Sequence, residues 1–403
     1  MKVDPGPAPS PVRGFRFSGV HGGLKSRGRR DFALVVADRP AAAAAVFTRN
    51  RAAAAPVIVA REHVADGRLQ ALMINSGNAN AATGEKGLKF ARWSCRELGS
   101  HLAIEPNLVL PCSTGVIGVE LEKIPFSRAI SLAVDGLSRN GFGAAARAIM
   151  TSDASPKWSH RIVPHGDSEV VVAGMAKGAG MIHPNMATML AFVLTDADLT
   201  SAAADRILRD AVAVSFNRIT VDGDTSTNDT CVLMASGQAG GGRISGPESP
   251  GYDAVAGAVV VVMDELSRLI IRDGEGATKM VDVVVEGAAD AAAADRIARS
   301  IGNSPLFKCA LAGADPNWGR IVMAVGKAGA DFDGDKLAVD VDDVVLARGG
   351  TLVSAEAQRM ARKVMRRDAF TVRVRVGDGP GTATIVTSDL TESYVRFNTA
   401  YTT

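Results

Sequence analysis

The sequence predicts a mixed fold of the α/β or α+β class. Apolar runs of strand length, such as Val170–Ala173, are interspersed with stretches in which apolar residues recur at helical spacing, such as Ala202–Phe216. Strands and helices therefore mix along the whole chain. The 403 residues are enough for two domains and a sizeable core.

Short strands and amphipathic helices account for the first 150 residues. A helix is expected at Lys86–Leu98, because Leu88, Ala91, Cys95 and Leu98 share one face. A strand at Asn107–Leu110 is expected to stop at Pro111, since proline has no N–H to donate to a ladder. The other expected elements are strands at Ala33–Ala37, Ala43–Thr48 and Leu69–Ile74, and helices at Ser127–Leu137 and Ala144–Met150.

The second half of the chain continues this mixture. A strand at Thr188–Leu194 precedes the helix Ala202–Phe216, and Ala254–Ile270 is apolar enough to be a buried helix. The glycine-rich run Gly377–Gly381 joins two alternating segments and predicts a hairpin of Phe370–Val376 with Thr382–Thr387. Further strands are expected at Lys279–Val285, Ile321–Val325 and Leu337–Val345, and helices at Ala291–Ser300 and Ala355–Met365.

A domain boundary is expected near Gly237–Gly251, which holds six glycines and two prolines. This interpretation gives a disordered tail at 1–12, an N-terminal domain at 13–236, a linker at 237–251 and a C-terminal domain at 252–403.

Composition narrows the function. The chain has 45 Lys and Arg against 43 Asp and Glu, so its charge does not favour nucleic acid as a partner. Four scattered cysteines without a CxxC pair argue against a zinc site or a disulfide framework and fit a reducing cytoplasm. No apolar run reaches the ~18 residues of a membrane span, and no signal peptide is evident.

Two charged segments have ordinary and functional interpretations. The cluster of Lys25, Arg27, Arg29 and Arg30 is most simply a solvated face, and less commonly a contact for a phosphate-bearing partner such as coenzyme A. The acidic loop Asp222–Asp229 does not fit a calcium loop, because Thr227 stands where glycine belongs in that register. No metal is expected.

The stretch Lys177–Leu190 combines a glycine turn, a proline and a threonine that opens a predicted strand. A threonine hydroxyl is a poor nucleophile unless a base lies beside it, and an N-terminal threonine carries its own α-amine, which titrates near ~7.7–8.0. Cleavage between Ala187 and Thr188 would expose such an amine. By pattern alone, the stretch is also compatible with a loop followed by a strand.

The segment Ser113-Thr114-Gly115 offers an N–H group and a hydroxyl at the end of a predicted strand. Such donors suit an oxyanion hole, although the same three residues also make an ordinary turn.

Several segments resemble the ornithine acetyltransferase family of arginine biosynthesis, also called the glutamate N-acetyltransferase family. The resemblance covers nearly the whole chain apart from the first dozen residues. The segments that carry it are Lys177–Leu190, Gly19–Lys25, Asn75–Asn80, Ser113–Gly118, Asp273–Lys279 and Asp315–Arg320.

The resemblance implies a fold, a reaction and an assembly. The fold would be an αββα sandwich that resembles, but is distinct from, N-terminal-nucleophile hydrolases. The reaction would transfer an acetyl group from N2-acetylornithine to glutamate through acetyl-Thr188, with no bound cofactor and with acetyl-coenzyme A as a candidate second donor. Cleavage at Ala187–Thr188 would give two fragments that assemble as an α2β2 heterotetramer.

The resemblance also assigns roles to single residues. Thr114 and Gly115 would form the oxyanion hole. Substrate would be bound by Thr188 itself and by Thr151, Lys177, Glu275, Asn398 and Thr403. The ending Asn398–Thr403 departs from the family's usual Asn-Ala-Asp-Tyr. Without the resemblance, Lys177 reads as a surface charge and Glu275 as a helix-end carboxylate.

Two other functions fit parts of the pattern. An autoproteolytic aminopeptidase or amidase would share the nucleophile but release the acyl group to water. An uncleaved metabolite-binding or scaffold protein would leave Thr188 inert. His183 is expected to pack or hydrogen-bond within its turn.

Overall fold

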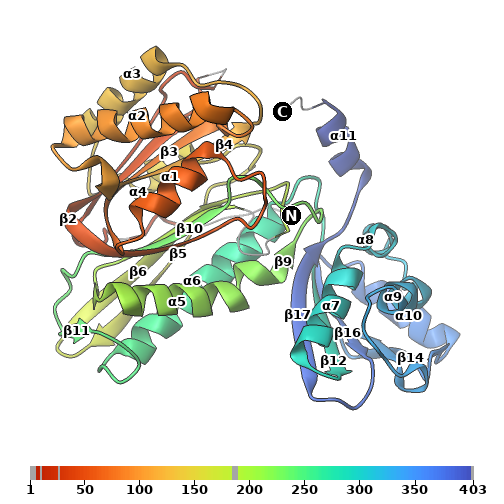
Figure 1. The fold of residues 1–403 in the computed structure, drawn as a ribbon. Coiled ribbons are helices and arrows are strands. Elements are labelled where there is room, and N and C mark those ends of the chain that lie inside the picture. The colour runs from red at the N-terminus through yellow and green to blue at the C-terminus, as the bar shows by residue number, and fades with distance from the viewer. Residues whose placement is uncertain (1–5, 10, 26–27, 184–188, 401–403) are drawn as a thin grey trace. The chain divides into compact units, whose positions relative to one another are not determined.

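The computed structural model describes residues 6–9, 11–25, 28–183 and 189–400. These residues form two compact units (Figure 1). The N-terminal unit contains the chain up to Asn217 together with Asp224–Ile270, and the C-terminal unit contains Arg218–Gly223 and the chain from Ile271 onward.

One sheet of eight strands organises the N-terminal unit, in the order β4-β3-β2-β10-β7-β6-β5, with β1 paired to β2. A small separate sheet joins β8 (Asp198–Leu199) to β11 (Arg243–Ile244). The strands of the large sheet are β1 (Phe15–Val20), β2 (Phe32–Phe47), β3 (Arg68–Asn78), β4 (Val109–Val116), β5 (Lys157–His165), β6 (Ser168–Lys177), β7 (Leu190–Thr195) and β10 (Thr230–Ala235).

The long strand β2 belongs to both halves of this sheet. Its first part pairs with β1 and β3, its second part pairs with β10, and the β2–β3 register shifts between Val36 and Ala41. Side chains alternate across β2. Val35 therefore joins an inner core with Phe192 of β7 and Met234 of β10, whereas Leu34 faces the opposite way into a core with helices.

Helices cover the outer faces. The core that contains Leu34 also contains apolar side chains of α2 and α3, whereas α5 contacts β2 and β10 and α6 packs on β6 (Figure 1). The inner core lies between the two halves of this one sheet, so the layers are helix, half-sheet, half-sheet, helix, which confirms the expected αββα arrangement. The helices of this unit are α1 (Ala55–His63), α2 (Gly84–Leu102), α3 (Lys123–Asp135), α4 (Phe142–Ala148), α5 (Ser201–Val214) and α6 (Tyr252–Arg272), whose last two residues enter the other unit.

The C-terminal unit is built on a seven-stranded sheet in the order β15-β14-β13-β16-β12-β17-β9. Apolar side chains of β12, including Val283, pack with Ile297 and Ile301 of α7 in its core. Its strands are β9 (Ile219–Thr220), β12 (Met280–Ala288), β13 (Ala338–Val341), β14 (Val344–Arg348), β15 (Thr351–Leu352), β16 (Ala369–Arg375) and β17 (Gly381–Ser388). Its helices are α7 (Ala291–Gly302), α8 (Pro305–Ala312), α9 (Trp318–Gly326), α10 (Ala355–Val364) and α11 (Glu392–Ala400).

Short 3-10 helices occur at Pro106–Leu108, Phe216–Arg218 and Gly334–Lys336. Within the described ranges, none of the helices combines the length and apolar character that crossing a membrane requires.

The expected hairpin of the C-terminal unit is wrong. Strands β16 and β17 do not pair with each other, because β12 lies between them, parallel to β16 and antiparallel to β17. The connecting glycine run passes over the end of β12, where the Gly379 N–H donates to the Gly287 carbonyl at 3.0 Å. Local alternation predicts both strands but cannot reveal a third strand from elsewhere in the chain.

Three other expectations are also wrong. Ile321–Val325 lies in helix α9, which begins after Asn317, whose side chain accepts from the Arg320 N–H. The two strands expected at Ala33–Ala37 and Ala43–Thr48 are one strand, β2, which ends at Phe47. Pro111 does not end its strand, because β4 is at the sheet edge, where a missing N–H is tolerated.

The two compact units do not divide at the glycine-rich segment Gly237–Gly251. That segment contains β11, which pairs with β8 inside the N-terminal unit, and the following helix α6 packs there too. A side chain at Gly174 of β6 would come within 2.8 Å of Val262 and Leu266 of α6, so helix and strand are in close contact. The division instead falls near the end of α6, at Ile270.

Candidate active site

The predicted site residues fall into two groups, one in each compact unit. Thr151, Thr114, Gly115 and Lys177 belong to the N-terminal unit. Glu275 and Asn398 belong to the C-terminal unit. Ala187, Thr188 and Thr403 lie outside the described residues.

Strand β6 ends at Lys177, and β7 begins at Leu190 as its antiparallel neighbour. The predicted cleavage position therefore lies between two adjacent strands. Gly178 follows Lys177 with a φ of +155°, and a side chain there would meet the Ile182 Cδ1 atom at 2.9 Å. Glycine is thus required where the chain leaves β6, as the turn expected from the sequence requires.

Thr114 and Gly115 form the end of edge strand β4, beside the end of β3. Gly115 has a φ of +132°, and a Cβ atom there would lie 2.3 Å from the Gly77 carbonyl carbon. The side chain of Lys177 reaches Thr114 from β6, with Nζ 3.3 Å from Oγ1. The hydroxyl of Thr114 accepts from Lys177 in this contact, so its own O–H can donate elsewhere.

Asp153 connects several of these segments. Its Oδ1 accepts from the Gly178 N–H and from the Lys157 ammonium, each at 2.7 Å, and its Oδ2 accepts from the Thr151 N–H at 2.8 Å. The side chains of Asp153 and Lys157 are both fully buried. The carboxylate therefore fixes the predicted binding residue Thr151 against the turn that follows Lys177.

Neighbouring positive charges determine the protonation state of Asp153. Burial alone would raise its pKa, but the positive charges of Lys157 and Lys177 and the hydrogen bonds to the carboxylate together hold the pKa well below its usual value. Asp153 is therefore ionised. The sequence analysis noted Thr151-Ser152-Asp153 only as a connecting segment, because nothing local indicates that its carboxylate is buried.

Two neighbouring cations share this region. Partial burial is the main reason why the pKa of Lys25 is lowered to about 8. The charge of Lys177 lowers this pKa further, whereas the charge of Asp31 raises it. The Nζ atom of Lys25 also donates to the Arg30 carbonyl at 3.2 Å. Of the basic cluster noted in the sequence, Lys25 is thus half-buried, and its ammonium donates to backbone carbonyls.

The ends of β3 and β4 are held by an amide and hydroxyl network. Ser113 donates to the Asn75 side-chain oxygen at 2.6 Å, and Asn228 donates to the carbonyls of Ala79 and Ser113 at 2.6 and 2.9 Å. The second half of the acidic loop therefore has a structural role. It positions the strand that ends in Thr114.

Asp229 is a second buried carboxyl group that the sequence analysis did not single out. Burial raises its pKa well above the usual value, although hydrogen bonding to Ser226 and the charge of Lys177 act in the opposite direction. Among the described residues, its Oδ2 atom has no hydrogen-bond partner. A buried carboxyl group with a raised pKa therefore lies just before β10, where the Thr230 N–H donates to the Met189 carbonyl beside β7.

In the C-terminal unit, Glu275 and Asn398 are in direct contact. The Asn398 Nδ2 atom donates to the Glu275 Oε2 atom at 3.0 Å, and Thr391 donates to the Gly276 carbonyl at 2.7 Å. Asp389 adds hydrogen bonds from the backbone N–H groups of Thr278 and Lys279. Helix α11 is thus tied to the segment Asp273–Lys279, and two predicted binding residues are brought together.

Comparisons with known proteins agree over the whole chain. A family model described as the ArgJ family matches residues 16–403. The arginine biosynthesis bifunctional protein ArgJ of Geobacter sulfurreducens is 46% identical over 392 residues, which cover 97% of this chain and 100% of that protein. The protein of the same name from Rhizobium meliloti is 42% identical over 393 residues, 97% of this chain and 95% of that protein.

A solved structure is also similar. The crystal structure of the arginine biosynthesis bifunctional protein ArgJ from Bacillus halodurans has a TM-score of 0.51 and 37% sequence identity, and the match covers 53% of this chain and 100% of that chain.

Proposed function

Because the chain belongs to the ArgJ family, we propose that it transfers an acetyl group from N2-acetylornithine to glutamate through a covalent acetyl-Thr188 intermediate. It is an acyltransferase of arginine biosynthesis. The observation that carries the proposal is the family match over residues 16–403, together with relatives at 46% and 42% identity over their full or nearly full length.

The nucleophile is generated by self-cleavage. The Thr188 hydroxyl attacks the carbonyl of Ala187, the peptide bond gives way to an ester, and water hydrolyses that ester to leave Thr188 with a free α-amine. The glycine at 178 and its hydrogen bond to Asp153 support this step, because they fix the chain where it leaves β6. The two fragments, 1–187 and 188–403, then assemble as an α2β2 heterotetramer.

Acetyl transfer proceeds in two half-reactions. The Thr188 hydroxyl attacks the acetyl carbonyl of N2-acetylornithine while its α-amine takes up the hydroxyl proton. That proton passes to the departing amino group of ornithine, and acetyl-Thr188 remains. The amino group of glutamate then attacks the ester and loses its proton to the same α-amine. The bond between the acetyl carbon and the Thr188 oxygen breaks, the α-amine returns the proton to that oxygen, and N-acetylglutamate leaves.

Each tetrahedral intermediate carries an oxyanion that needs donors. The Gly115 N–H and the Thr114 hydroxyl are assigned this role, and each donor contributes about 2.7–4 kcal/mol by comparison with measured oxyanion holes. The contact from Lys177 to Thr114 supports the assignment, since it orients the hydroxyl as an acceptor on one side and leaves its proton for the substrate.

The remaining residues bind the amino-acid substrates. Lys177 supplies a cation for a carboxylate, and Glu275 supplies an acceptor for an ammonium group, with Asn398 holding Glu275 in place. Thr151 and Thr403 complete the binding set. Acetyl-coenzyme A serves as a second acetyl donor, no cofactor is bound, and the enzyme works in the cytoplasm.

The test compares wild-type protein with Thr188→Ala. Wild-type protein should run as two fragments on a denaturing gel, exchange acetyl between N-acetylornithine and glutamate, and give parallel double-reciprocal plots. The variant should remain one chain without activity. An active wild-type protein that runs only as an intact chain contradicts the mechanism, and acetate release that ignores glutamate would identify an amidase instead.

A further inference from the structure

A pocket of about 430 Å³ opens against one face of α2 in the N-terminal unit. Lys86, Lys89, Trp93 and Arg96 lie at spacings of three and four residues along that helix, so they share the face that lines the pocket. Lys123, at the start of α3, lines the pocket from across. Two helices therefore direct basic side chains toward the same space.

The charge of this pocket is uncompensated. Four cations line it, Lys86, Lys89, Arg96 and Lys123, against the single carboxylate Glu120. Lys86 pairs with Glu120 at 2.9 Å. The other three cations make no ion pair with any residue that the structure describes. A ligand with several negative charges would supply the missing partners.

Two aromatic residues line the pocket. Phe90 is buried and Trp93 is half-buried, with their ring centroids 5.2 Å apart. The Nζ atom of Lys123 lies 5.2 Å from the centroid of the Trp93 ring. A partly exposed indole beside cations suits a planar base, which stacks on an aromatic ring while its phosphates meet the positive charges.

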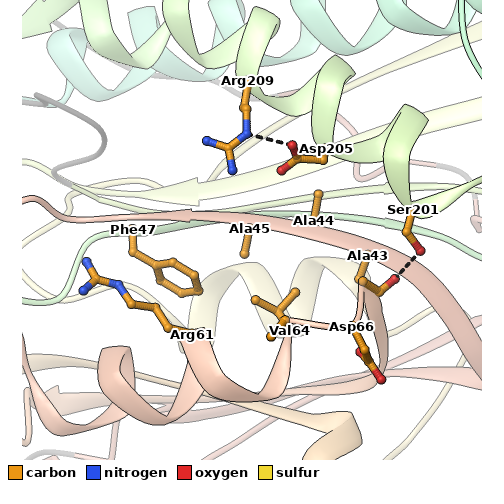
Figure 2. Close-up of a pocket in the computed structure, with 12 residues that line it drawn as sticks. Ala43, Ala44, Ala45, Phe47, Arg61, Val64, Asp66, Ser201, Asp205 and Arg209 are labelled. Atoms are coloured by element: carbon orange, nitrogen blue, oxygen red, sulfur yellow. Dashed lines mark hydrogen bonds and ion pairs between the residues drawn. The ribbon is translucent and has the colours of Figure 1, made fainter.

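A second pocket of the same unit shows the contrast (Figure 2). Its volume is about 390 Å³, and its lining includes Ala43, Ala44 and Ala45 of β2. Its charged residues already have partners in the protein: Arg209 pairs with Asp205 at 2.8 Å, and Arg61 donates to the Thr48 carbonyl at 2.6 Å. Two arginines balance two aspartates there, so nothing favours an anionic ligand.

The pocket on α2 is connected by hydrogen bonds to the loops that follow β3 and β4, and β4 carries Thr114 and Gly115. Strands β3 and β4 are parallel, and the loops that leave their carboxyl ends lead to the pocket. Asn80 donates to the Gly87 carbonyl at 3.1 Å and accepts from the Thr83 hydroxyl at 2.8 Å. The Gly118 N–H donates to the Ala81 carbonyl at 2.9 Å, which ties the two loops together.

We propose that this pocket binds the phosphorylated adenosine of acetyl-coenzyme A. The proposal rests on the proposed function, in which acetyl-coenzyme A is a second donor to Thr188. Adenine stacks on Trp93 in place of the Lys123 ammonium, which moves to the phosphates together with Lys89 and Arg96. The flexible pantetheine arm carries the thioester to the nucleophile. The acetyl carbon then forms its bond to the Thr188 oxygen, the carbon–sulfur bond breaks, and the thiolate leaves as the free thiol with the proton from the Thr188 α-amine.

The experiment uses the self-cleaved enzyme and the double variant Lys89→Gln/Lys123→Gln. The KM for acetyl-coenzyme A should rise about tenfold or more, because charged hydrogen bonds are lost and each 1.4 kcal/mol corresponds to a factor of ten. The KM for N-acetylornithine in the same double variant should change less than about twofold. The control Arg128→Gln/Lys363→Gln removes two exposed positive charges outside the pocket and should leave both constants unchanged.

Calorimetric titration of wild-type protein with acetyl-coenzyme A and with ADP compares the affinity of the pocket for coenzyme A with its affinity for a free nucleotide. Tighter binding of acetyl-coenzyme A, lost in the double variant, supports the proposal. Equal binding of ADP would assign the pocket to free nucleotides and overturn it. Absence of binding, or an unchanged KM for acetyl-coenzyme A in the double variant, would also overturn it, whereas a wild-type protein that cannot use N-acetylornithine contradicts the proposed function itself.

Discussion

Asp153 is the residue on which the arrangement near β6 depends most. It is a fully buried carboxylate whose partners include the equally buried Lys157, the turn at Gly178 and the backbone of Thr151. Breaking such a pair leaves an uncompensated charge in the interior, which costs more than the pair itself contributes. Asp153 is therefore a structural determinant of the site rather than a group that touches substrate.

Asp153→Asn should lower the free energy of unfolding by about 3–5 kcal/mol, because it leaves the Lys157 ammonium buried without its counter-charge. Urea denaturation at neutral pH measures the change. The control Asp343→Asn removes an exposed carboxylate that makes no described contact and should have almost no effect. Asp153→Asn/Lys157→Met should recover part of the loss, and equal stability of all three variants would contradict the role assigned to the pair.

The same pair predicts a pH dependence. The folded pKa of Asp153 lies below the unfolded value of ~3.9, so its contribution to stability is fully present above the unfolded pKa and is lost as the pH falls from there through the folded pKa. Wild-type protein should therefore lose stability between about pH 5 and pH 2 more steeply than Asp153→Asn. Parallel stability curves for the two proteins would show that Asp153 does not titrate in this way.

At the scale of elements, Gly115 shows how β3 and β4 shape the candidate oxyanion hole. The two strands end side by side so closely that a Cβ atom at position 115 would overlap the Gly77 carbonyl carbon at 2.3 Å. Its φ of +132° is also unfavourable for any other residue. The N–H group assigned to the oxyanion depends on both features.

Gly115→Ala should reduce kcat by about 10²–10³ through displacement of an oxyanion donor. Gly118→Ala is the matched control, since Gly118 also has a positive φ, +84°, but no atom lies within 4 Å of its added Cβ. That variant should lose only about 1–2 kcal/mol of stability to backbone strain. Steady-state kinetics and thermal unfolding measure both, and similar kcat values in the two variants would contradict the oxyanion assignment.

Helix α11 places Asn398 in hydrogen-bond contact with Glu275, so the C-terminal segment contributes to the predicted binding residues. Deleting Asn398–Thr403 should raise the KM of both amino-acid substrates and increase hydrolysis of acetyl-Thr188, while cleavage at Ala187–Thr188 continues. Kinetics and acetate release measure these effects. Arg396→Ala is the control, because Arg396 is exposed and its one ion pair among the described residues is with Glu392 on the same helix, at 3.8 Å. Unchanged KM values after the deletion would indicate an ordinary frayed end.

At the scale of the whole molecule, the predicted cleavage divides the central sheet between two chains. Strand β6 would belong to the first fragment and β7 to the second, although they pair at six positions. Strand β2 of the first fragment also pairs with β10 of the second at six positions. The two fragments thus share one sheet and one inner core.

The fragments of the cleaved protein should therefore stay together without denaturant. Size-exclusion chromatography under native conditions should give a single peak that contains both bands, and the bands should separate only when urea unfolds the sheet. Thr188→Ala should elute at the same position as an intact chain. Separation of wild-type fragments in native buffer would contradict the shared sheet.

Local features and the family follow from the amino-acid sequence alone. Helical spacing located α2, α5, α7 and α10 to within a few residues, and the glycine turn after Lys177 was recognised because glycine alone tolerates such backbone. The motifs around Thr114, Lys177 and Glu275 carried the resemblance that the comparisons confirmed. The roles of those residues remain predictions, because Thr188 lies outside the described residues.

Features that depend on distant segments are visible only in the three-dimensional structure. In this structure, β12 lies between β16 and β17, Pro111 lies at a sheet edge, and α6 packs with the N-terminal unit. Asp153 is buried against Lys157 and Gly178. One pocket is lined by Lys89, Trp93 and Lys123. Sequence patterns report on neighbours along the chain, whereas strand order, burial of charge and pocket lining arise from contacts between residues far apart in it.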